Sequence, residues 1–300
     1  MPAIERVLPE RGGHPVVALR GALTGFGHGP PRIVSLVPSL TELICDLGLA
    51  DCLVGRTAFC VHPDRLLVGV PRIGGTKTPK LERILELAPS HVLVNVDENR
   101  REDAEWLAAR VPALVVTHPV EVEDHFELFV RLGALWDRDA QAQQLSRRLD
   151  EALDRLSARS YDPIHLAYLI WSEPWMTISP DTYIARLLAT VGLINVSISG
   201  CAERYPTVAQ ERLAASDVSA LLLSSEPCRF KASDRQRLLS LRGLAGGSGS
   251  GIPILGIDGE MCSWYGSRVI QALDYLAGYR RRLEARIARR MSRWSAHAAN

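Results

Sequence analysis

The sequence lacks several features that would indicate a class of protein at once. No run reaches about 18 apolar residues, which excludes a membrane-spanning helix. Neither sign of charge is in excess, since 35 Lys and Arg accompany 34 Asp and Glu, and this balance excludes nucleic-acid binding through bulk positive charge. Hydrophobic residues make up 47% and charged residues 23%, which is typical of globular proteins and excludes a disordered chain. At about 150 residues per domain, the 300 residues predict two domains.

Cysteine pairs and an export signal are also missing. The six cysteines are Cys45, Cys52, Cys60, Cys201, Cys228 and Cys262. None forms a CxxC pair, so we predict no disulfide framework. Charges interrupt the first residues, and the longest apolar stretch there, Pro15 to Leu19, is too short for the core of a secretory signal. Both absences favour a reducing compartment, and we therefore predict a cytoplasmic protein.

Short β-rich runs alternate with helix patterns along most of the chain. Strands are expected at 32–37, 52–55, 91–96, 113–117, 164–171, 220–224 and 252–257. Helices are expected after Ser39 and Thr78 and at about 101–110, 183–191, 208–215, 233–241 and 267–277. Ser39 with Glu42 forms a capping box, and Thr78 precedes a proline at the first helical position. The alternation predicts parallel sheets with crossover connections.

A single long helix is expected in the middle of the chain. Residues 139–159 contain neither Gly nor Pro, and leucines recur among charges at helical spacing. The sequences before and after this helix share a local similarity. Glu82 and Glu211 each stand early in a helix that leads into a buried strand. We infer an α/β fold of two Rossmann-like lobes with parallel sheets, joined by one long backbone helix, with a ligand cleft between the lobes. The expected segments are an N-terminal extension 1–31, a lobe 32–137, the linking helix 138–160, a second lobe 161–279 and a basic tail 280–300.

Four local sequences carry a resemblance to a known family. In chain order they are RIVSLVPSLTELICDLG, KLERILELAPSHVLV, YPTVAQERLAASDVSALLL and IDGEMCSWYGSRVIQAL. With the lobe, long helix and second lobe, the chain resembles the helical-backbone metal-receptor family. These are the class III substrate-binding proteins that hold cobalamin or iron siderophores for ABC importers. The resemblance implies a solute-binding protein that holds a metal chelate in its cleft, either a corrinoid such as cobalamin or a ferric siderophore or haem-like ligand.

The resemblance also implies a partner. In that family one exposed glutamate on each lobe docks against arginines of an ABC permease, and local alignment places these at Glu82 and Glu211. Two such carboxylates would make charge-steered contacts with the permease. Alternatively, each acid merely occupies the first turn of a helix, where the helix dipole favours negative charge. This alternative explains either glutamate alone better than it explains the pair.

The candidate ligand site lies in loops that follow strands, because ligands of such folds bind outside the carboxyl ends of the strands. On the first lobe the candidates are Ser39, Phe59, Cys60, His62, Lys77 and Asn99. On the second they are Trp171, Trp175, Glu226, Cys228, Glu260, Cys262, Trp264, Tyr265 and Arg268. Flat aromatic faces suit a large planar ring. We interpret Trp175 and the Trp264–Tyr265 pair as ligand contacts, while Trp171 fits a ligand contact and the lobe core equally well.

Cys60 and His62 form a CxH pair that can direct two ligands towards one metal. A site completed by a Glu or Cys of the second lobe would suit a soft or borderline metal, and His62 alone fits as an axial ligand to a chelated cobalt or iron. The alternative, which we favour, is a histidine that caps a loop beside a buried thiol. Lys77 and Arg268 are expected to neutralise carboxylates or phosphates of the ligand, although Arg268 also fits a pairing within its own helix.

No nucleophile elbow, GxGxxG, HExxH or kinase signature occurs, so no motif supports an enzyme. The alternative function is a cytoplasmic enzyme or metallocofactor-handling protein on the same two-lobed fold, using Cys, His and Glu residues of the cleft. Asp97 and Glu98 are then candidate acids or bases. A third and weaker hypothesis is an interaction module acting through Glu82, Glu211 and the basic tail, which we expect to be a solvated terminal helix.

Overall fold

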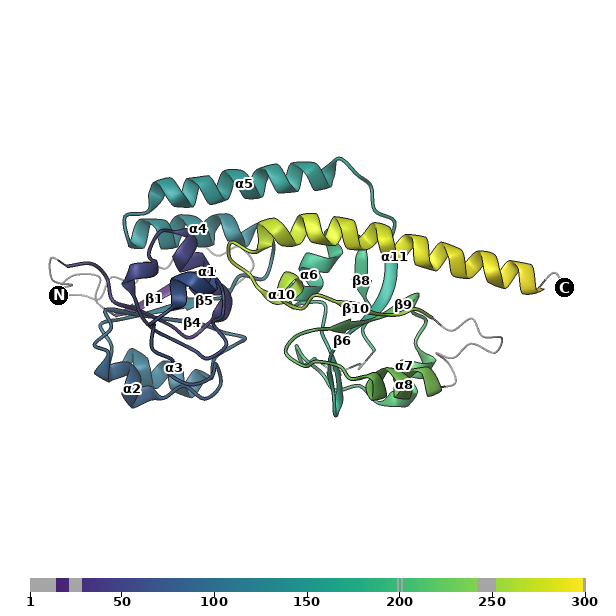
Figure 1. Ribbon diagram of the computed structural model, residues 1–300, viewed down its shortest axis with the longest axis horizontal. Coiled ribbons are helices and arrows are strands. Elements are labelled where there is room, and N and C mark those ends of the chain that lie inside the picture. The colour runs from purple at the N-terminus through teal and green to yellow at the C-terminus, as the bar shows by residue number, and fades with distance from the viewer. Residues whose placement is uncertain (1–14, 22–28, 199, 201, 242–251, 299–300) are drawn as a thin grey trace. The chain divides into compact units, whose positions relative to one another are not determined.

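The chain forms two compact units, each built around its own sheet (Figure 1). The computed structural model describes residues 15–21, 29–198, 200, 202–241 and 252–298. The first unit comprises residues 1–150 with 265–269, and the second comprises 151–264 with 270–300. The two-lobed α/β fold predicted from the sequence is confirmed. Within the described residues, no helix has the length and apolar character needed to cross a membrane.

The sheet of the first unit has the strand order β1-β5-β4-β2-β3. Its strands are β1 Val17–Gly21, β2 Ile33–Ser35, β3 Leu53–Arg56, β4 His91–Asn95 and β5 Ala113–Thr117. The pairs β2–β3, β2–β4 and β4–β5 are parallel, whereas the edge strand β1 runs antiparallel to β5. Every residue of the central strand β4 is buried, as expected for a parallel strand that is covered on both faces. The segment 1–31, predicted as an extension, thus contributes a strand to the sheet.

Helices of the first unit pack apolar side chains against this sheet. They are α1 Pro38–Asp46, α2 Leu81–Glu86, α3 Arg101–Ala108, α4 Asp124–Leu135 and the first part of α5 Asp139–Ser157, with 3-10 turns η1 Ala50–Cys52 and η2 Asp64–Leu67. Ile84 of α2 and Leu107 of α3 contribute to one cluster with Val34, Val92 and Leu114 of the strands, and all five are fully buried or nearly so. Helix α5 leads the chain from the first unit into the second.

Two predicted helix caps are wrong. Helix α1 begins at Pro38 after Val37, so Ser39 lies inside its first turn and Glu42 is not part of a capping box. Helix α2 begins at Leu81, because Pro79 forms a short antiparallel bridge with Gly74 instead of starting the helix. Both sequence signals were local, whereas a strand end and a bridge determine where these helices begin.

The sheet of the second unit has the order β10-β9-β6-β7, and β8 also pairs with β6. Its strands are β6 Ile164–Ser172, β7 Trp175–Thr177, β8 Leu193–Asn195, β9 Ala220–Ser224 and β10 Ile254–Ile257. All pairs are parallel except β6–β7. The helices are α6 Tyr183–Ala189, α7 Gln210–Ala215, α8 Ala232–Ser240, α10 Glu260–Ser263 and α11 Val269–Ala298. The Gly/Ser loop predicted at 243–251 and Cys201 lie outside the described residues.

Helix α11 continues through the residues predicted as a solvated tail. Arg280 is only 2% exposed. Its Nε donates to Glu284 Oε1 at 2.9 Å, Nη1 to the carbonyl of Gly192 at 3.0 Å and Nη2 to the carbonyl of Asp162 at 2.6 Å. Buried carbonyls require donors, so the start of this segment belongs to the packed part of the second unit.

Candidate functional site

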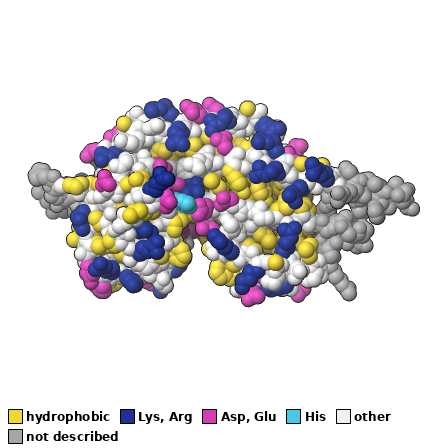
Figure 2. All heavy atoms as spheres, in the orientation of Figure 1, with side chains coloured by type: hydrophobic (Ala, Val, Ile, Leu, Met, Phe, Trp, Pro, Cys, Tyr) yellow, Lys and Arg dark blue, Asp and Glu magenta, His cyan; other side chains and the backbone are white. Residues whose placement is uncertain are grey.

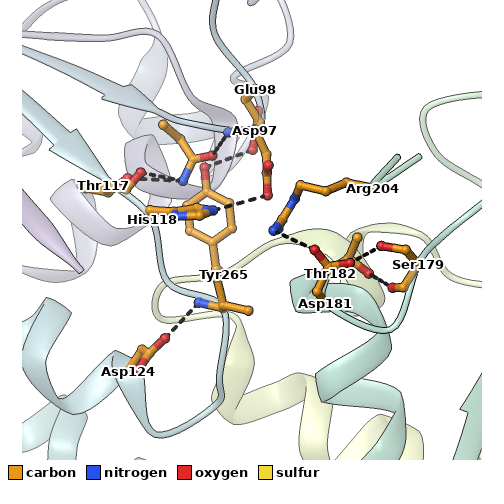
Figure 3. Close-up of polar contacts among 12 residues, drawn as sticks. Asp97, Glu98, Thr117, His118, Asp124, Ser179, Asp181, Thr182, Arg204 and Tyr265 are labelled. Carbon is orange, nitrogen blue, oxygen red and sulfur yellow. Dashed lines mark hydrogen bonds and ion pairs between the residues drawn. The ribbon is translucent and has the colours of Figure 1, made fainter. Parts of the chain in front are cut away.

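Polar side chains of the first unit gather at the carboxyl ends of β4 and β5 (Figure 3). Asn95, the last residue of β4, donates from Nδ2 to the carbonyl of Thr117 at 2.9 Å and accepts from the Asp97 backbone N–H at 2.8 Å. This bond turns the chain so that the Asp97 carboxylate lies 3.8 Å from Nε2 of His118, the residue that follows β5. Parallel strands end at the same edge of a sheet, which brings these side chains together.

Tyr265 completes this polar cluster from far along the chain. Its hydroxyl donates to Glu98 Oε1 at 3.0 Å. Burial raises the pKa of Tyr265 well above its ordinary value, and the nearby Glu98 carboxylate raises it further. The phenol therefore stays protonated at neutral pH and acts as a hydrogen-bond donor. Of the two acids predicted as candidate acids or bases, Asp97 thus faces a histidine and Glu98 faces a phenol.

Lys77 and Asn99 lie at the same edge. Lys77 Nζ donates to the carbonyl of Asp97 at 2.8 Å. Burial lowers the pKa of Lys77, against smaller raising effects of Glu98 and Asp97. A turn held by Gly74 presents Lys77. Gly74 has φ +103°, and a Cβ there would lie 2.5 Å from the carbonyl of Thr78, so only glycine fits.

Asn99 is committed to holding the loops of this edge. Its Nδ2 donates to the carbonyls of Leu36 and Thr76 at 3.2 and 3.0 Å, and its Oδ1 accepts from the Asn95 backbone N–H at 2.8 Å. The side chain is buried. Asn99 therefore positions the segment after β4 together with the turn that carries Lys77.

Cys60 is fully buried beneath this edge. Thr41 Oγ1 donates to its sulfur at 3.0 Å, and Thr57 Oγ1 lies 3.1 Å from it. Burial raises the pKa of the Cys60 thiol, against smaller lowering effects of the two threonines. His62 is half-buried in the following loop. Among the described residues no three His, Cys, Asp or Glu side chains come close enough together to hold a metal ion, and a metal at Cys60 and His62 stays a prediction.

Glu42 and Arg268 form a buried ion pair in the first unit. The guanidinium is bidentate, with Nε 2.7 Å from Oε2 and Nη2 2.8 Å from Oε1. Burial raises the pKa of Glu42 even though the Arg268 hydrogen bonds and charge lower it. Because the guanidinium is buried and bound to Glu42, its role here is to hold residues 265–269 to helix α1. Ser39, buried on the same helix, also lies in the packed interior.

In the second unit, tryptophans mark the ends of β6 and β7. Trp171 is 40% exposed, and its Nε1 donates to the carbonyl of Glu173 at 3.0 Å. Trp175 is only 3% exposed, because it stacks on Phe230 at 6.2 Å between ring centroids and Arg237 covers its ring at 4.9 Å. The indole that presents an open face is therefore Trp171.

The loop after β9 and helix α10 are tied together. Trp264 Nε1 donates to Glu226 Oε2 at 3.1 Å, and Ser224 Oγ donates to the Glu226 carbonyl at 2.6 Å. Cys262 is fully buried, and burial raises the pKa of its thiol to about 12. Glu260 and Cys228 are half-buried in the adjoining loops. Of the sequence candidates in this unit, the side chains with surface left for a ligand are Trp171, Glu226, Cys228 and Glu260.

Sequence reasoning missed a second polar cluster, between β7 and α6 (Figure 3). Asp181 accepts from Ser179 Oγ and lies 3.5 Å from Arg204 Nη1, while Thr182 Oγ1 donates to the Ser179 carbonyl at 2.8 Å. The Ser179 hydrogen bond is the largest cause of a lowered pKa of Asp181. His118 was missed as well, although its place directly after the predicted strand 113–117 was a usable signal.

The two predicted docking glutamates hold equivalent places in their own units. Glu82 and Glu211 are exposed residues in the first turns of the six-residue helices α2 and α7. Their neighbours are engaged elsewhere, since Arg83 binds Glu86 at 2.5 Å and Arg212 Nη1 donates to the Ile198 carbonyl at 3.3 Å. Within the residues that the structure describes, neither Glu82 nor Glu211 makes an ion pair.

Comparison with known sequences decides the family. The model of the periplasmic binding protein family matches residues 33–246. The chain belongs to this family. This periplasmic binding protein is also similar to the vitamin B12-binding protein of Photorhabdus laumondii, at 25% identity over 199 residues, which cover 64% of this chain and 71% of that protein. The corresponding protein of Vibrio parahaemolyticus is 23% identical over 194 residues, 64% of this chain and 70% of that protein.

Solved structures of periplasmic binding proteins share the fold. The apo heme-binding protein RhuT from Roseiflexus sp. RS-1 has a TM-score of 0.71 at 23% identity, covering 85% of this chain and 99% of that one. The vitamin B12-binding protein BtuF of Vibrio cholerae has a TM-score of 0.68 at 18% identity, covering 85% and 98%.

The predicted cytoplasmic location is wrong. The family and its solved relatives are periplasmic binding proteins. The prediction was based on the cysteine pattern and on the lack of a recognisable export signal, and cysteines without a CxxC pair occur in both compartments, so cysteine usage was not able to decide the location.

Proposed function

We propose that this periplasmic binding protein holds a metal chelate with a large planar ring, either a corrinoid such as cobalamin or a haem. The observation that carries the proposal is the family match together with similarity to vitamin B12-binding proteins. Relatives by fold include a heme-binding protein with two bound hemes. Ferric siderophores are the remaining ligands that the family resemblance implies.

Side chains at the strand ends of each unit support a planar ligand. Phe59 of the first unit is 61% exposed and Trp171 of the second is 40% exposed, and both stand at the carboxyl ends of strands. Exposed aromatic side chains at such places would bury a large apolar area and stack when a flat ring covers them, which favours binding of the ring. Lys77 supplies an ammonium group for a propionate or phosphate of the chelate.

Direct titration tests the proposal. The purified protein is mixed with cyanocobalamin, haemin or a ferric hydroxamate siderophore, and absorbance and thermal unfolding are followed. We expect saturable binding of cobalamin or haem in equal proportion to protein. A ligand at 100 times its Kd stabilises the folded protein by about 2.7 kcal/mol, so the midpoint of thermal unfolding rises. Absence of binding by both cobalamin and haem would overturn the proposal, and binding of the siderophore alone would assign the remaining ligand class of the family.

Replacing Trp171 with Ala is expected to weaken chelate binding about tenfold, because the exposed indole face is lost. The Kd from the absorbance titration measures the effect. Trp106→Ala is the matched control, since Trp106 lies on α3 with the Arg110 guanidinium 4.2 Å from its ring centroid, and its Kd should equal that of the unchanged protein. Equal losses in both variants would remove Trp171 from the site.

We further propose that Glu82 and Glu211 bind arginines of an ABC permease. The support is that members of the family work with ABC transporters. Reversing both charges, Glu82→Lys with Glu211→Lys, is expected to weaken binding to the permease in lipid nanodiscs at least 100-fold, since close charge pairs at interfaces contribute several kcal/mol. Chelate binding should not change. The double control Asp150→Lys with Glu151→Lys alters the exposed face of α5 by the same charge, and should leave permease binding intact.

A further inference from the structure

A basic hollow lies beside the edge strand β10 of the second unit. One part, of about 440 Å³, is lined by Arg282 and Arg286 of α11 together with Tyr275 and Tyr279. The adjoining part, of about 650 Å³, is lined by Arg229 and Lys231 of the segment before α8. Arg235 and Gly256 line both parts, so they form one continuous groove.

The charge of this groove is almost entirely positive. Five cationic side chains come to it from the segment before α8, from α8 and from α11, and they are Arg229, Lys231, Arg235, Arg282 and Arg286. None of the five makes an ion pair with another of the described residues. Figure 2 shows basic side chains over the described part of α11.

The acidic residues near this groove are already engaged. The sequence from 235 to 257 contains no acid. Asp258, the acid that lines the groove, accepts the backbone N–H groups of Glu260 and Met261 at 3.0 and 3.3 Å. Glu284 of α11 is bound to Arg280. Like charges held close together repel, and an anion in the groove relieves that repulsion.

The floor of the groove offers a further donor. Tyr275 Oη accepts the Asp258 backbone N–H at 3.0 Å, and among the described residues its own proton has no acceptor. Burial raises the pKa of Tyr275, so the proton is present at neutral pH. Gly256 leaves the floor open, because a Cβ built there would meet no atom within 4 Å.

We propose that this groove binds an anion with at least two phosphate groups. Guanidinium groups pair with phosphate oxygens through two parallel hydrogen bonds. One phosphate would pair with Arg282 and Arg286 beside Tyr275, and the other with Arg229 and Lys231. Arg235 lines both parts of the groove and would lie between the two phosphates. Soluble polyphosphates and diphosphate lipid headgroups both offer this chemistry, and neither is the planar chelate of the proposed function.

Calorimetric titration with sodium tripolyphosphate at low ionic strength tests the proposal. We expect saturable binding that weakens as salt is added. Arg235→Gln should weaken it at least tenfold, because hydrogen bonds to charged groups are among the stronger ones. Gly256→Leu should weaken it similarly by filling the groove without altering any charge. The control Arg147→Gln with Arg148→Gln removes exposed charges from α5 and should not change binding.

Two further measurements assign the source of the phosphates and separate this site from the chelate site. Sedimentation with cardiolipin vesicles, lost in Arg235→Gln, would assign the lipid headgroup, whereas binding of tripolyphosphate alone would assign a soluble ligand. Cobalamin and haem should bind Arg235→Gln as they bind the unchanged protein. Failure of both phosphate probes, or equal losses in Arg235→Gln and the α5 control, would overturn the proposal whatever the chelate titration shows.

Discussion

Replacing Arg280 with Ala is expected to lower the free energy of unfolding by about 3–5 kcal/mol, the range for truncating a large, fully buried side chain to alanine. The guanidinium donates to the carbonyls of Val191, Gly192 and Asp162 as well as to Glu284. Its removal takes one donor from each of these carbonyls, of which those of Val191 and Gly192 belong to buried residues, and opens a cavity under α11. Urea unfolding followed by far-ultraviolet circular dichroism measures the change.

Two variants show which of these contacts matters. Arg281→Ala alters the exposed neighbour on the same helix, and its effect should stay within about 0.5 kcal/mol. Glu284→Gln removes the ion pair but leaves the three carbonyl contacts. Because the Glu284 side chain is half exposed, that loss should be at most about 1 kcal/mol. If Arg280→Ala costs no more than Glu284→Gln, the carbonyl contacts do not stabilise the fold.

Acid is expected to destabilise the first unit between about pH 6.5 and pH 4, through two buried histidines. Burial lowers the pKa of both His91 and His125 from 6.5 to about 4. Within that window the unfolded chain binds protons that the folded chain does not, so stability is complete above pH 6.5 and falls as the pH falls. His125 is fully buried, and its shift alone corresponds to a loss of about 3 kcal/mol.

Unfolding by urea at a series of pH values checks this expectation. Nδ1 of His125 lies 2.9 Å from the carbonyl of Val122, and His125→Asn keeps an amide donor there without a titrating group. That variant should show a smaller fall in stability between pH 6.5 and pH 4. His165→Asn changes an exposed histidine and should follow the unchanged protein. A pH dependence that is the same in all three proteins would exclude His125 as a source of the acid sensitivity.

Much of the fold follows from local sequence patterns. The strands at 113–117 and 220–224 coincide with the predicted ranges, and the uninterrupted leucine spacing predicted the helix that is now α5. These elements are predictable because burial of a regular apolar face requires a regular repeat. The edge strand β1 was missed because its residues are mostly exposed and become a strand only by pairing with β5.

The candidate site was predicted less well, because its side chains are placed by distant contacts. Glu42 and Arg268 are 226 positions apart, and no local pattern connects them. The sequence around Glu42 matches a capping box, but in the structure the Glu42 carboxylate pairs with Arg268 instead. Similarly, the sequence favoured Trp175 as a ligand contact and left Trp171 open between ligand contact and core, whereas the packing of Phe230 and Arg237 on Trp175 leaves Trp171 as the more open of the two indoles.

The first unit includes a segment from late in the chain, and this affects when the unit can complete its folding during synthesis. Residues 265–269 belong to that unit and bring Tyr265 to Glu98 and Arg268 to Glu42. At typical rates of synthesis, a ribosome releases this segment on the order of ten seconds after residue 150. Until then the Glu42 carboxylate has no guanidinium partner. The unit that is translated first is therefore completed only when residues 265–269 have been translated. A nascent chain that ends at residue 264 lacks this segment of its first unit.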